Sequence, residues 1–333
     1  MAVVSSKCAA ALSTWKRLSN TPHDLSESTA VQWLGFIAVI DVRGNCLLFH
    51  VKWNVWSQLP KLPGNLAKGC PLACFDDKLL ALAQNGILYE FIPRISQWKT
   101  NQTLDLGKLC GQVGVQTQQP AYVEFASCGN TLFVIYMHQT QQTGSVNQQR
   151  GLQRSQPATN LETFLKMYDG SSWSHPSPLN LDQNVPRLSI TTHSPSTIYI
   201  NTDHAVYSIQ VSPQSASSTS KDIDLELKVT THSPPPLERS TLCMVDDSLF
   251  AFGGKDEDSQ PFANVYQYIQ ETDSWQVVGC MGSSRYGVAI AVFKGEEESD
   301  NVFVVGGCLG GSTQATNGCR IIESCKISVK REI

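Results

Sequence analysis

Short apolar runs alternate with polar turns along this chain, and two of the runs end in paired glycines. Residues 249–252 (LFAF) and 302–305 (VFVV) are each followed by Gly-Gly. Such short apolar runs fit strands that are buried on both faces. Glycine after a strand allows a positive φ and a close approach of other backbone. The pattern predicts β-strands separated by tight turns.

The clearest unit lies between residues 237 and 280. It contains an arginine, two apolar strands, the glycine pair, a third strand at 265–269, a polar turn and an outer strand at 275–278. Tyr268 in the third strand precedes Trp275 by seven positions. A second copy begins at Ser284 and repeats the arginine, the strands and the glycines. The unit resembles the kelch repeat, which forms one four-stranded blade of a β-propeller.

The spacing between an aromatic residue and a tryptophan recurs earlier in the chain. Phe49 precedes Trp56, and Phe91 precedes Trp98, by the same seven positions. Trp56 and Trp98 are 42 positions apart, a period typical of propeller repeats. The resemblance therefore implies an all-β, six-bladed kelch-type β-propeller. The predicted blades span residues 22–64, 65–107, 113–181, 185–231, 237–280 and 284–327, although the first four lack the double glycine and the fourth lacks the tryptophan.

Local features are also predicted within these blades. Residues 33–40 are expected to form one strand, and Asn85-Gly86 is a hairpin signal between two strands of the second blade. Residues 139–159, rich in Gln, Ser and Asn, are expected to be a disordered or mobile insertion between strands. The tryptophans at repeat positions are expected to pack in the core.

The two ends of the chain complement each other. Residues 13–19 (STWKRLS) resemble an isolated outer strand with Trp15, whereas the last blade ends without a tryptophan strand. We expect the N-terminal strand to complete the C-terminal blade, because an open ring would leave unpaired sheet edges. Residues 1–12 and 328–333 are then expected to be tails.

Composition narrows the function. Charged residues make up 16% of the chain and the formal net charge is −4, which disfavours a nucleic-acid-binding surface. No apolar run reaches the roughly 20 residues that span a bilayer, so no membrane partner is expected. The 11 cysteines are scattered without zinc-site spacing, which favours a reduced, cytoplasmic protein.

Motifs for chemistry are weak. The seven histidines are dispersed without an H-x-H or H-E-x-x-H pattern. The glycine-rich stretch 306–312 lacks the Lys-Ser/Thr of a phosphate loop, and no G-x-S-x-G nucleophile elbow occurs. The acidic pairs, such as Asp246 and Asp247, read as hairpin turns. We therefore expect no enzyme activity, no metal and no cofactor.

Arginines at blade starts are the candidate binding residues. Arg187, Arg239 and Arg285 occupy these positions, and Tyr286 follows the last of them. In kelch propellers of ubiquitin-ligase adaptors, arginines at this point can line the face that grips an acidic peptide. An arginine fork suits a carboxylate because it donates two parallel hydrogen bonds. The alternative is that these arginines tie blades together through backbone carbonyls. Both interpretations stay open at Arg285, and the structural one is favoured at Arg187.

The resemblance implies a non-catalytic protein-interaction module that binds through one face of the propeller. Recruitment of substrates to a ubiquitin ligase is one form of this, although the sequence contains no BTB-type domain. The alternatives are an enzyme acting on a sugar or small metabolite in the central pocket, and an actin-binding protein. Charged residues and histidines converging at the axis would favour the enzyme, whereas an apolar plugged channel would exclude it.

Overall fold

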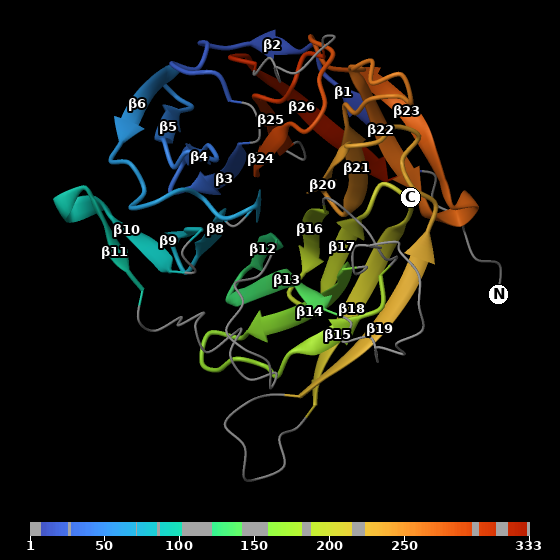
Figure 1. Ribbon diagram of the computed structural model, residues 1–333. Coiled ribbons are helices and arrows are strands. Elements are labelled where there is room, and N and C mark those ends of the chain that lie inside the picture. The colour runs from blue at the N-terminus through green and yellow to red at the C-terminus, as the bar shows by residue number, and fades with distance from the viewer. Residues whose placement is uncertain are drawn as a thin grey trace, which may run out of the picture.

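Six antiparallel sheets surround a central axis as the blades of a propeller (Figure 1). The computed structural model describes residues 8–25, 28–70, 72–84, 87–101, 122–141, 159–181, 188–214, 224–294, 300–310 and 319–331. Within these ranges the helical elements are two three-residue 3-10 turns, η1 (Pro93–Ile95) and η2 (Gln270–Thr272). The predicted six-bladed, all-β fold is confirmed.

Each blade has four main strands, which follow chain order from the axis outward, with the N-terminal strands outermost in blade 6 (Figure 1). The strands are, in blade 1, β3 (Thr29–Trp33), β4 (Phe36–Ile40), β5 (Cys46–His50) and β6 (Val55–Leu59); in blade 2, β8 (Leu72–Phe75), β9 (Lys78–Leu82), β10 (Leu88–Ile92) and β11 (Gln97–Thr100); in blade 3, β12 (Tyr122–Cys128), β13 (Thr131–Gln141), β14 (Thr159–Tyr168) and β15 (Ser177–Leu179); in blade 4, β16 (Ser189–Ser194), β17 (Thr197–Asn201), β18 (Val206–Gln214) and β19 (Asp224–His232); in blade 5, β20 (Thr241–Val245), β21 (Ser248–Phe252), β22 (Asn264–Ile269) and β23 (Ser274–Cys280); and in blade 6, β24 (Ala289–Phe293), β25 (Asp300–Val305) and β26 (Ile322–Arg331) with β1 (Cys8–Leu12) and β2 (Lys16–Arg17).

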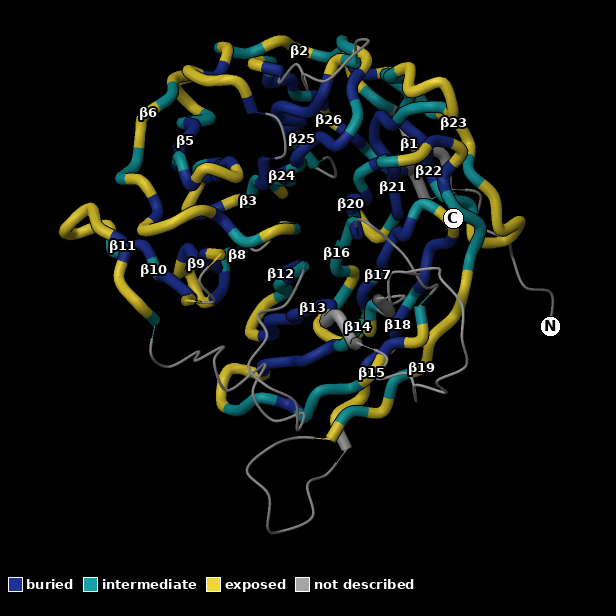
Figure 2. Tube along the Cα trace, viewed as in Figure 1, coloured by how far each residue is buried: buried dark blue, intermediate teal, exposed yellow. Residues whose placement is uncertain are grey.

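The two faces of the ring differ in the loops that they carry. Because the strands of a blade are antiparallel and sequential, the turns after its first and third strands lie on one face, here called the hairpin face. The loops after second strands and the connections between blades lie on the other, here called the crossover face. Inner strands β3, β8, β12, β16, β20 and β24 contact one another around the axis. Buried residues lie along the strands, and exposed ones gather in turns and outer strands (Figure 2).

The N-terminal strand closes the ring, as predicted. Strands β1 and β2 both pair antiparallel with β26. The pairing extends further than the sequence suggested, since Cys8 pairs with Arg331. Residues 8–12 and 328–331, which we had expected in tails, therefore belong to the sheet of blade 6. The ladder continues because each strand supplies hydrogen-bonding partners that the other would otherwise lack.

The repeated tryptophans join neighbouring blades. The indole Nε1 of Trp56, Trp98 and Trp275 donates to the carbonyl of Ser19, Pro60 and Ser233, at 2.9, 2.8 and 2.9 Å respectively. Each acceptor follows the outer strand of the preceding blade. The aromatic residue seven positions earlier packs on the same ring, with Phe49–Trp56 centroids 4.9 Å apart. The spacing in the sequence therefore marks a structural seam, in which Trp98 is buried and Trp56 and Trp275 are half-buried.

Each of the two glycine pairs packs against the backbone of the segment that leads into the next blade. Gly253 has a φ of +61°, and a Cβ on it would lie 2.2 Å from the Arg285 carbonyl oxygen. That same oxygen accepts a hydrogen bond from the Gly254 amide at 3.0 Å. In blade 6 the carbonyl of Leu25 plays the same part for Gly307, at 3.1 Å. A side chain at these positions would separate the blades.

Two local features were not predicted. Residues 33–40, which we expected to form one strand, are divided by a two-residue hairpin at Leu34 and Gly35, with φ values of 47° and 82°. Positive φ at both positions is the type I′ geometry that fits strand twist. The two-residue strand β7 (Gly69–Cys70) pairs parallel with the inner edge of β12. The predicted hairpin at residues 85–86 and most of the predicted insertion at 139–159 lie outside the described residues.

Candidate functional site

The inner strands enclose a channel of about 1410 Å³, and residues from both ends of these strands line it. Apart from the short pairing of β7 with β12, the inner strand of each blade is an edge strand, so its outward N–H and C=O groups face the channel without a strand partner. Hydroxyl side chains from neighbouring blades satisfy several of these groups. The contacts are Ser127 Oγ to the Cys74 carbonyl, Thr192 Oγ1 to the Ser127 carbonyl, Thr241 Oγ1 to the Val288 carbonyl, and the amides of Leu242 and Met244 to Ser189 Oγ and Thr191 Oγ1, at 2.7–3.1 Å. These hydrogen bonds tie the inner strands of neighbouring blades together along the wall of the channel.

Arg239 lies at the crossover mouth of this channel, and the structure brings it together with Tyr286. Its guanidinium carbon lies 5.5 Å from the centroid of the Tyr286 ring. The backbone of Arg239 has a φ of 57°, and its amide donates to Asp203 Oδ1 at 2.8 Å. The Arg239 carbonyl accepts from the Gly287 amide at 3.1 Å. Arg239 is thus held on both sides of its backbone, and its half-exposed side chain faces the lining of the channel.

Tyr286 is also half-buried. Burial raises the pKa of its hydroxyl, and the Cys308 thiol adds to the shift while the positive charge of Arg239 opposes it. The cation–π attraction between the guanidinium and the ring favours this position of the Arg239 side chain. The pair therefore places an arginine at the mouth.

Arg285 occupies a different kind of position. It is 0% exposed. Its Nη1 donates to the carbonyls of Gly306 and Ile321, at 2.9 and 3.1 Å, and its Nη2 bonds Glu323 Oε2 at 2.8 Å. These contacts match the alternative interpretation, in which the arginine ties blades together. Arg285 is not available to a partner on the surface, so it is removed from the candidate binding set.

The register explains why the two arginines differ. Glu238 pairs with Lys255 directly after one glycine pair, and Tyr286 pairs with Cys308 directly after the other. Glu238 is therefore equivalent to Tyr286, which makes Arg239 equivalent to Gly287 and Arg285 equivalent to the buried Leu237. Arg239 therefore lies two positions after the residue that is equivalent to Arg285. Arg187 lies outside the described residues.

Other polar residues at the crossover mouth were missed by the sequence reasoning. The Tyr122 hydroxyl donates to Glu124 Oε1 at 2.5 Å and accepts from the Leu188 amide at 3.1 Å. Glu124 is 3% exposed. Lys68 and Glu124 both line the channel. Nothing in the local pattern marked these residues, because the segment before Tyr122 carries no repeat signature.

The hairpin mouth is acidic. Among the described residues Asp77, Asp246, Asp247 and Asp300 line this end, together with Lys294. Asp246 and Asp247 form the two-residue turn between β20 and β21, with φ values of 44° and 61°. The predicted hairpin is therefore present, and it projects carboxylates toward the axis.

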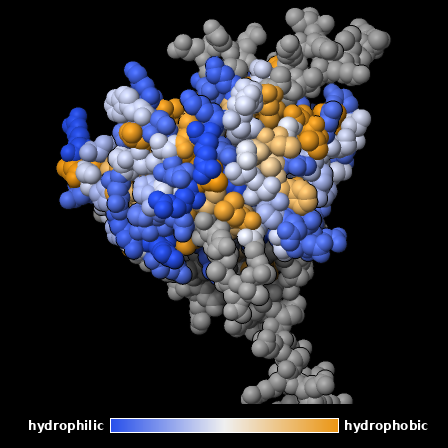
Figure 3. All heavy atoms as spheres, turned by 90° about the horizontal axis from the view of Figure 1, so that it is seen from above, coloured by the Kyte–Doolittle hydropathy of each residue, from blue (hydrophilic) through white to orange (hydrophobic). Residues whose placement is uncertain are grey.

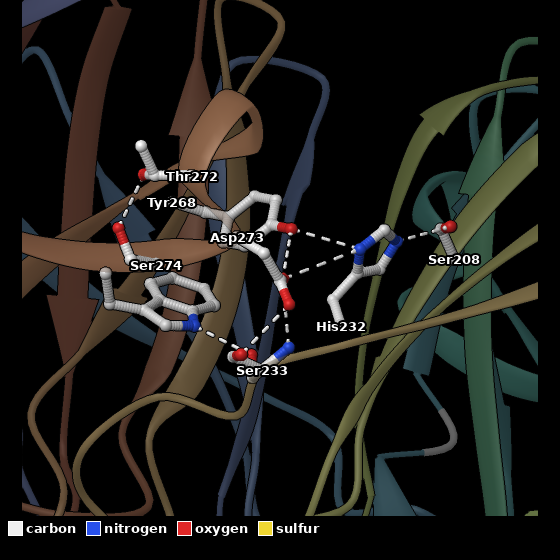
Figure 4. Close-up of polar contacts among 8 residues, drawn as sticks. Ser208, His232, Ser233, Tyr268, Thr272, Asp273 and Ser274 are labelled. Carbon is white, nitrogen blue, oxygen red and sulfur yellow. Dashed lines mark hydrogen bonds and ion pairs between the residues drawn. The ribbon is translucent and has the colours of Figure 1, made fainter.

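A polar network joins blades 4 and 5 at the outer seam (Figure 4). His232 Nε2 lies 2.8 Å from Ser208 Oγ, and its Nδ1 lies 3.0 Å from the Tyr268 hydroxyl. Tyr268 donates to Asp273 Oδ1 at 2.6 Å. Hydrogen bonds from Tyr268 and Ser233 hold the pKa of Asp273 below its usual value, whereas burial and the bond to Asp273 raise the pKa of Tyr268.

The order of groups in this network resembles a hydroxyl–imidazole–acid relay, but the geometry is that of a seam. His232 Nδ1 is 3.9 Å from Asp273 Oδ1, with the tyrosine hydroxyl bonded to both. The Ser233 amide donates to Asp273 Oδ1. In the same way, the Ser19 amide donates to Asn54 Oδ1 at 2.9 Å. A contact that repeats beside the seam tryptophans supports blade packing.

The described residues hold no group of three or more histidine, cysteine or acidic side chains placed to bind a metal ion. Burial raises the pKa of the thiols of Cys46, Cys243 and Cys325 to about 12, so these cysteines pack as small apolar residues. No helix in the described part of the chain has the length and apolar character needed to cross a membrane.

Comparison with known proteins supports the fold. Residues 236–282, which contain blade 5, match the family model described as Kelch motif. A solved structure of YjhT is similar over 94% of this chain and 99% of its own, with a TM-score of 0.61 and 11% sequence identity. A search of curated proteins found no match. The chain is a six-bladed β-propeller, and the segment that matches the Kelch motif model forms blade 5.

Proposed function

We propose that the protein is a non-catalytic protein-interaction module, and that it receives an acidic segment of its partner at the crossover mouth. Binding of protein partners is a general use of kelch propellers, and the fold supports it in that general sense. Loops presented by a rigid ring of strands suit recognition, because the scaffold fixes their positions.

The oriented guanidinium of Arg239 is the observation that carries this proposal. Its backbone is fixed by Asp203 and Gly287, and its guanidinium lies over the Tyr286 ring. An arginine that is already immobilised loses less entropy when it bonds a carboxylate. Arg187, Arg239 and Tyr286 remain the proposed partner-binding residues, whereas Arg285 supports the blade that carries Tyr286. Recruitment of substrates to a ubiquitin ligase is one form that this interaction can take.

The test is comparative affinity purification from lysate with quantitative mass spectrometry. The baits are the wild type, Arg239→Ala, Arg239→Lys and Arg17→Ala, where Arg17 is exposed on outer strand β2. We expect partners retained by the wild type and Arg17→Ala to be lost with Arg239→Ala. Arg239→Lys should also weaken them, because lysine keeps the charge but lacks the planar fork. Equal retention by Arg239→Ala, with an unchanged melting temperature, would contradict the proposal.

The second candidate function is an enzyme acting on a sugar or other small metabolite in the channel. The channel of about 1410 Å³ is larger than the roughly 300–1,000 Å³ of common ligand pockets. It is lined by charged residues from several blades and by His193, which is the convergence that favours an enzyme. Thermal-shift screening with sugars and sugar acids tests this. A ligand that stabilises the wild type and is consumed on incubation would support the enzyme over the binding module.

A further inference from the structure

We propose that the hairpin face carries a second docking surface, which fits a segment of a partner protein that combines basic residues with an apolar side chain. The surface is formed by exposed apolar residues of blade 1 and by the carboxylates at the hairpin mouth. It is separate from the crossover face and does not depend on Arg239.

The apolar part lies at one end of blade 1. Trp53, Leu34 and Val55 are 66%, 52% and 48% exposed. Leu34 is in the turn between β3 and β4, Trp53 is in the turn between β5 and β6, and Val55 starts β6. Single exposed apolar residues are ordinary on a protein surface, but three at one end of one blade form a patch. The outer side of the ring, in contrast, shows hydrophilic and apolar residues interspersed (Figure 3).

The exposed tryptophan is fixed in place. The ring of Trp53 stacks on His50 with centroids 5.4 Å apart and an interplanar angle of 22°. His50 in turn meets the edge of Phe36, with centroids 4.8 Å apart, and His50 Nε2 lies 2.6 Å from Ser57 Oγ. Phe36 directly follows the Leu34–Gly35 turn. A rigid aromatic residue with most of its surface open is the kind of anchor that dominates binding energy at protein interfaces.

The charged part begins beside the same turn. The indole Nε1 of Trp33 donates to the Asp77 carbonyl at 2.8 Å, which holds the Asp76–Asp77 turn of blade 2 against the Leu34 turn of blade 1. Leu34 and Asp77 both line the hairpin mouth. Asp246 and Asp247 of blade 5 and Asp300 of blade 6 also line this mouth of the channel. The apolar patch and the carboxylates therefore form one continuous surface.

Charge complementarity selects the occupant. In the described part of this mouth four aspartates face a single lysine, Lys294, so lysine or arginine side chains are favoured there and acidic ones are disfavoured. Lys52 precedes Trp53 on the outer side of the patch. The basic residues of the partner segment are therefore expected on the channel side of its apolar anchor. An anionic membrane or a nucleic acid would meet repulsion from the same carboxylates.

The test is selection of binders from a displayed library of random peptides of about ten residues, which span roughly 33 Å when extended. Selected peptides are then measured by fluorescence polarisation against the wild type, Trp53→Ser, the double variant Asp77→Asn/Asp246→Asn, and Arg239→Ala. Asn tolerates positive φ, so the double variant removes charge at Asp77 (φ 56°) and Asp246 (φ 44°) without changing the turns. Melting temperatures confirm that each variant is folded.

We expect selection to enrich peptides in which lysine or arginine lies beside an aromatic or aliphatic residue. Trp53→Ser and the double variant should each weaken binding by about tenfold, as for a central anchor or several facing charges. Arg239→Ala should bind these peptides as tightly as the wild type, which separates this surface from the crossover mouth. The proposal is overturned by acidic or purely polar winners that bind Arg239→Ala as tightly as the wild type, by failure to enrich any peptide that binds both of these proteins equally, or by equal binding to all variants. Self-association that Trp53→Ser abolishes would identify a second copy as the occupant and would also overturn it.

Discussion

The buried pair of Arg285 and Glu323 offers the sharpest test of the structural interpretation. Arg285 and Glu323 have side chains 0% and 4% exposed. The equivalent positions in blade 1 are Leu25 and Leu47, both 1% exposed. The Leu25 carbonyl accepts from the second glycine of the blade 6 pair, as the Arg285 carbonyl does in blade 5. Leu47 has the same register in β5 as Glu323 has in β26. The informative variants are therefore Arg285→Leu, Glu323→Leu and their combination.

Each single variant leaves one buried charge without its counter-ion, which destabilises a protein by about 3–5 kcal/mol. Unfolding entropy of about 2.1 cal/mol/K per residue, over 333 residues, is about 0.7 kcal/mol/K. Each single variant should therefore lower the melting temperature by about 4–7 °C. The double variant replaces the pair with the leucines that blade 1 already uses. It should lie within about 2 kcal/mol of the wild type, since well-packed apolar replacements of buried pairs are often neutral.

Calorimetry and urea titration of the four proteins give the coupling energy from a double-mutant cycle. Single effects of about 3–5 kcal/mol each and a double effect within about 2 kcal/mol imply a coupling of at least about 4 kcal/mol. If the double variant is destabilised by the sum of the singles, the two charges do not compensate each other and the reasoning fails. If Arg285→Leu is as stable as the wild type, the arginine is not a tie between blades.

Three further predictions address the seams, the glycines and the thiols. Trp98→Phe should lower the free energy of unfolding by about 1 kcal/mol, because it removes the indole bond to the Pro60 carbonyl. Trp53→Phe, at a 66% exposed ring, should change it by less than about 0.5 kcal/mol, and equal effects in urea titration would contradict the seam. Gly253→Ala should destabilise the protein by more than about 2 kcal/mol, because the new Cβ would lie 2.2 Å from the Arg285 carbonyl oxygen. Gly129→Ala should cost only about 1 kcal/mol, because Gly129, at φ +57°, has nothing within 4 Å of its Cβ position. Comparable melting temperatures of the two variants would refute this. Iodoacetamide at neutral pH should label the exposed Cys280 and spare Cys46 and Cys325, whose thiol pKa burial raises to about 12; intact-mass and peptide analysis would reveal early labelling of the buried pair.

Blades 5 and 6 were readable from the sequence because their strands end in glycine pairs that only a close backbone contact requires. The tryptophan spacing was readable for a related reason, since three seams use the same indole bond, from Trp56, Trp98 and Trp275. Residues 33–40 were misread because Leu34 adopts positive φ, which a leucine seldom does, so its turn carries no turn residue except Gly35. Strand β7 is two residues long and pairs with a blade that follows later in the chain, so no local pattern could mark it.

The candidate site was only partly predictable for a geometric reason. Arg239 and Tyr286 were both identified, and they meet because adjacent crossovers converge at the axis. Arg285 was grouped with Arg239 because both precede an apolar strand. The distances to the strand ends differ, however, with six positions from Arg239 to Val245 and eight from Arg285 to Phe293. That difference was visible in the sequence, and it corresponds to the displacement of two positions in the structure.

The pairing of β1 with β26 also sets the order in which the molecule can be completed. Leu12 pairs with Ile327, so the partner of β1 is synthesised long after β1 itself. Joining residues about 300 apart carries a loop-closure free energy of about 5 kcal/mol, which many contacts made at once must offset. Blades 1 to 5 can form from local hairpins while synthesis continues. We therefore expect the ring to be sealed late in folding, with β1 left as an unpaired edge until then.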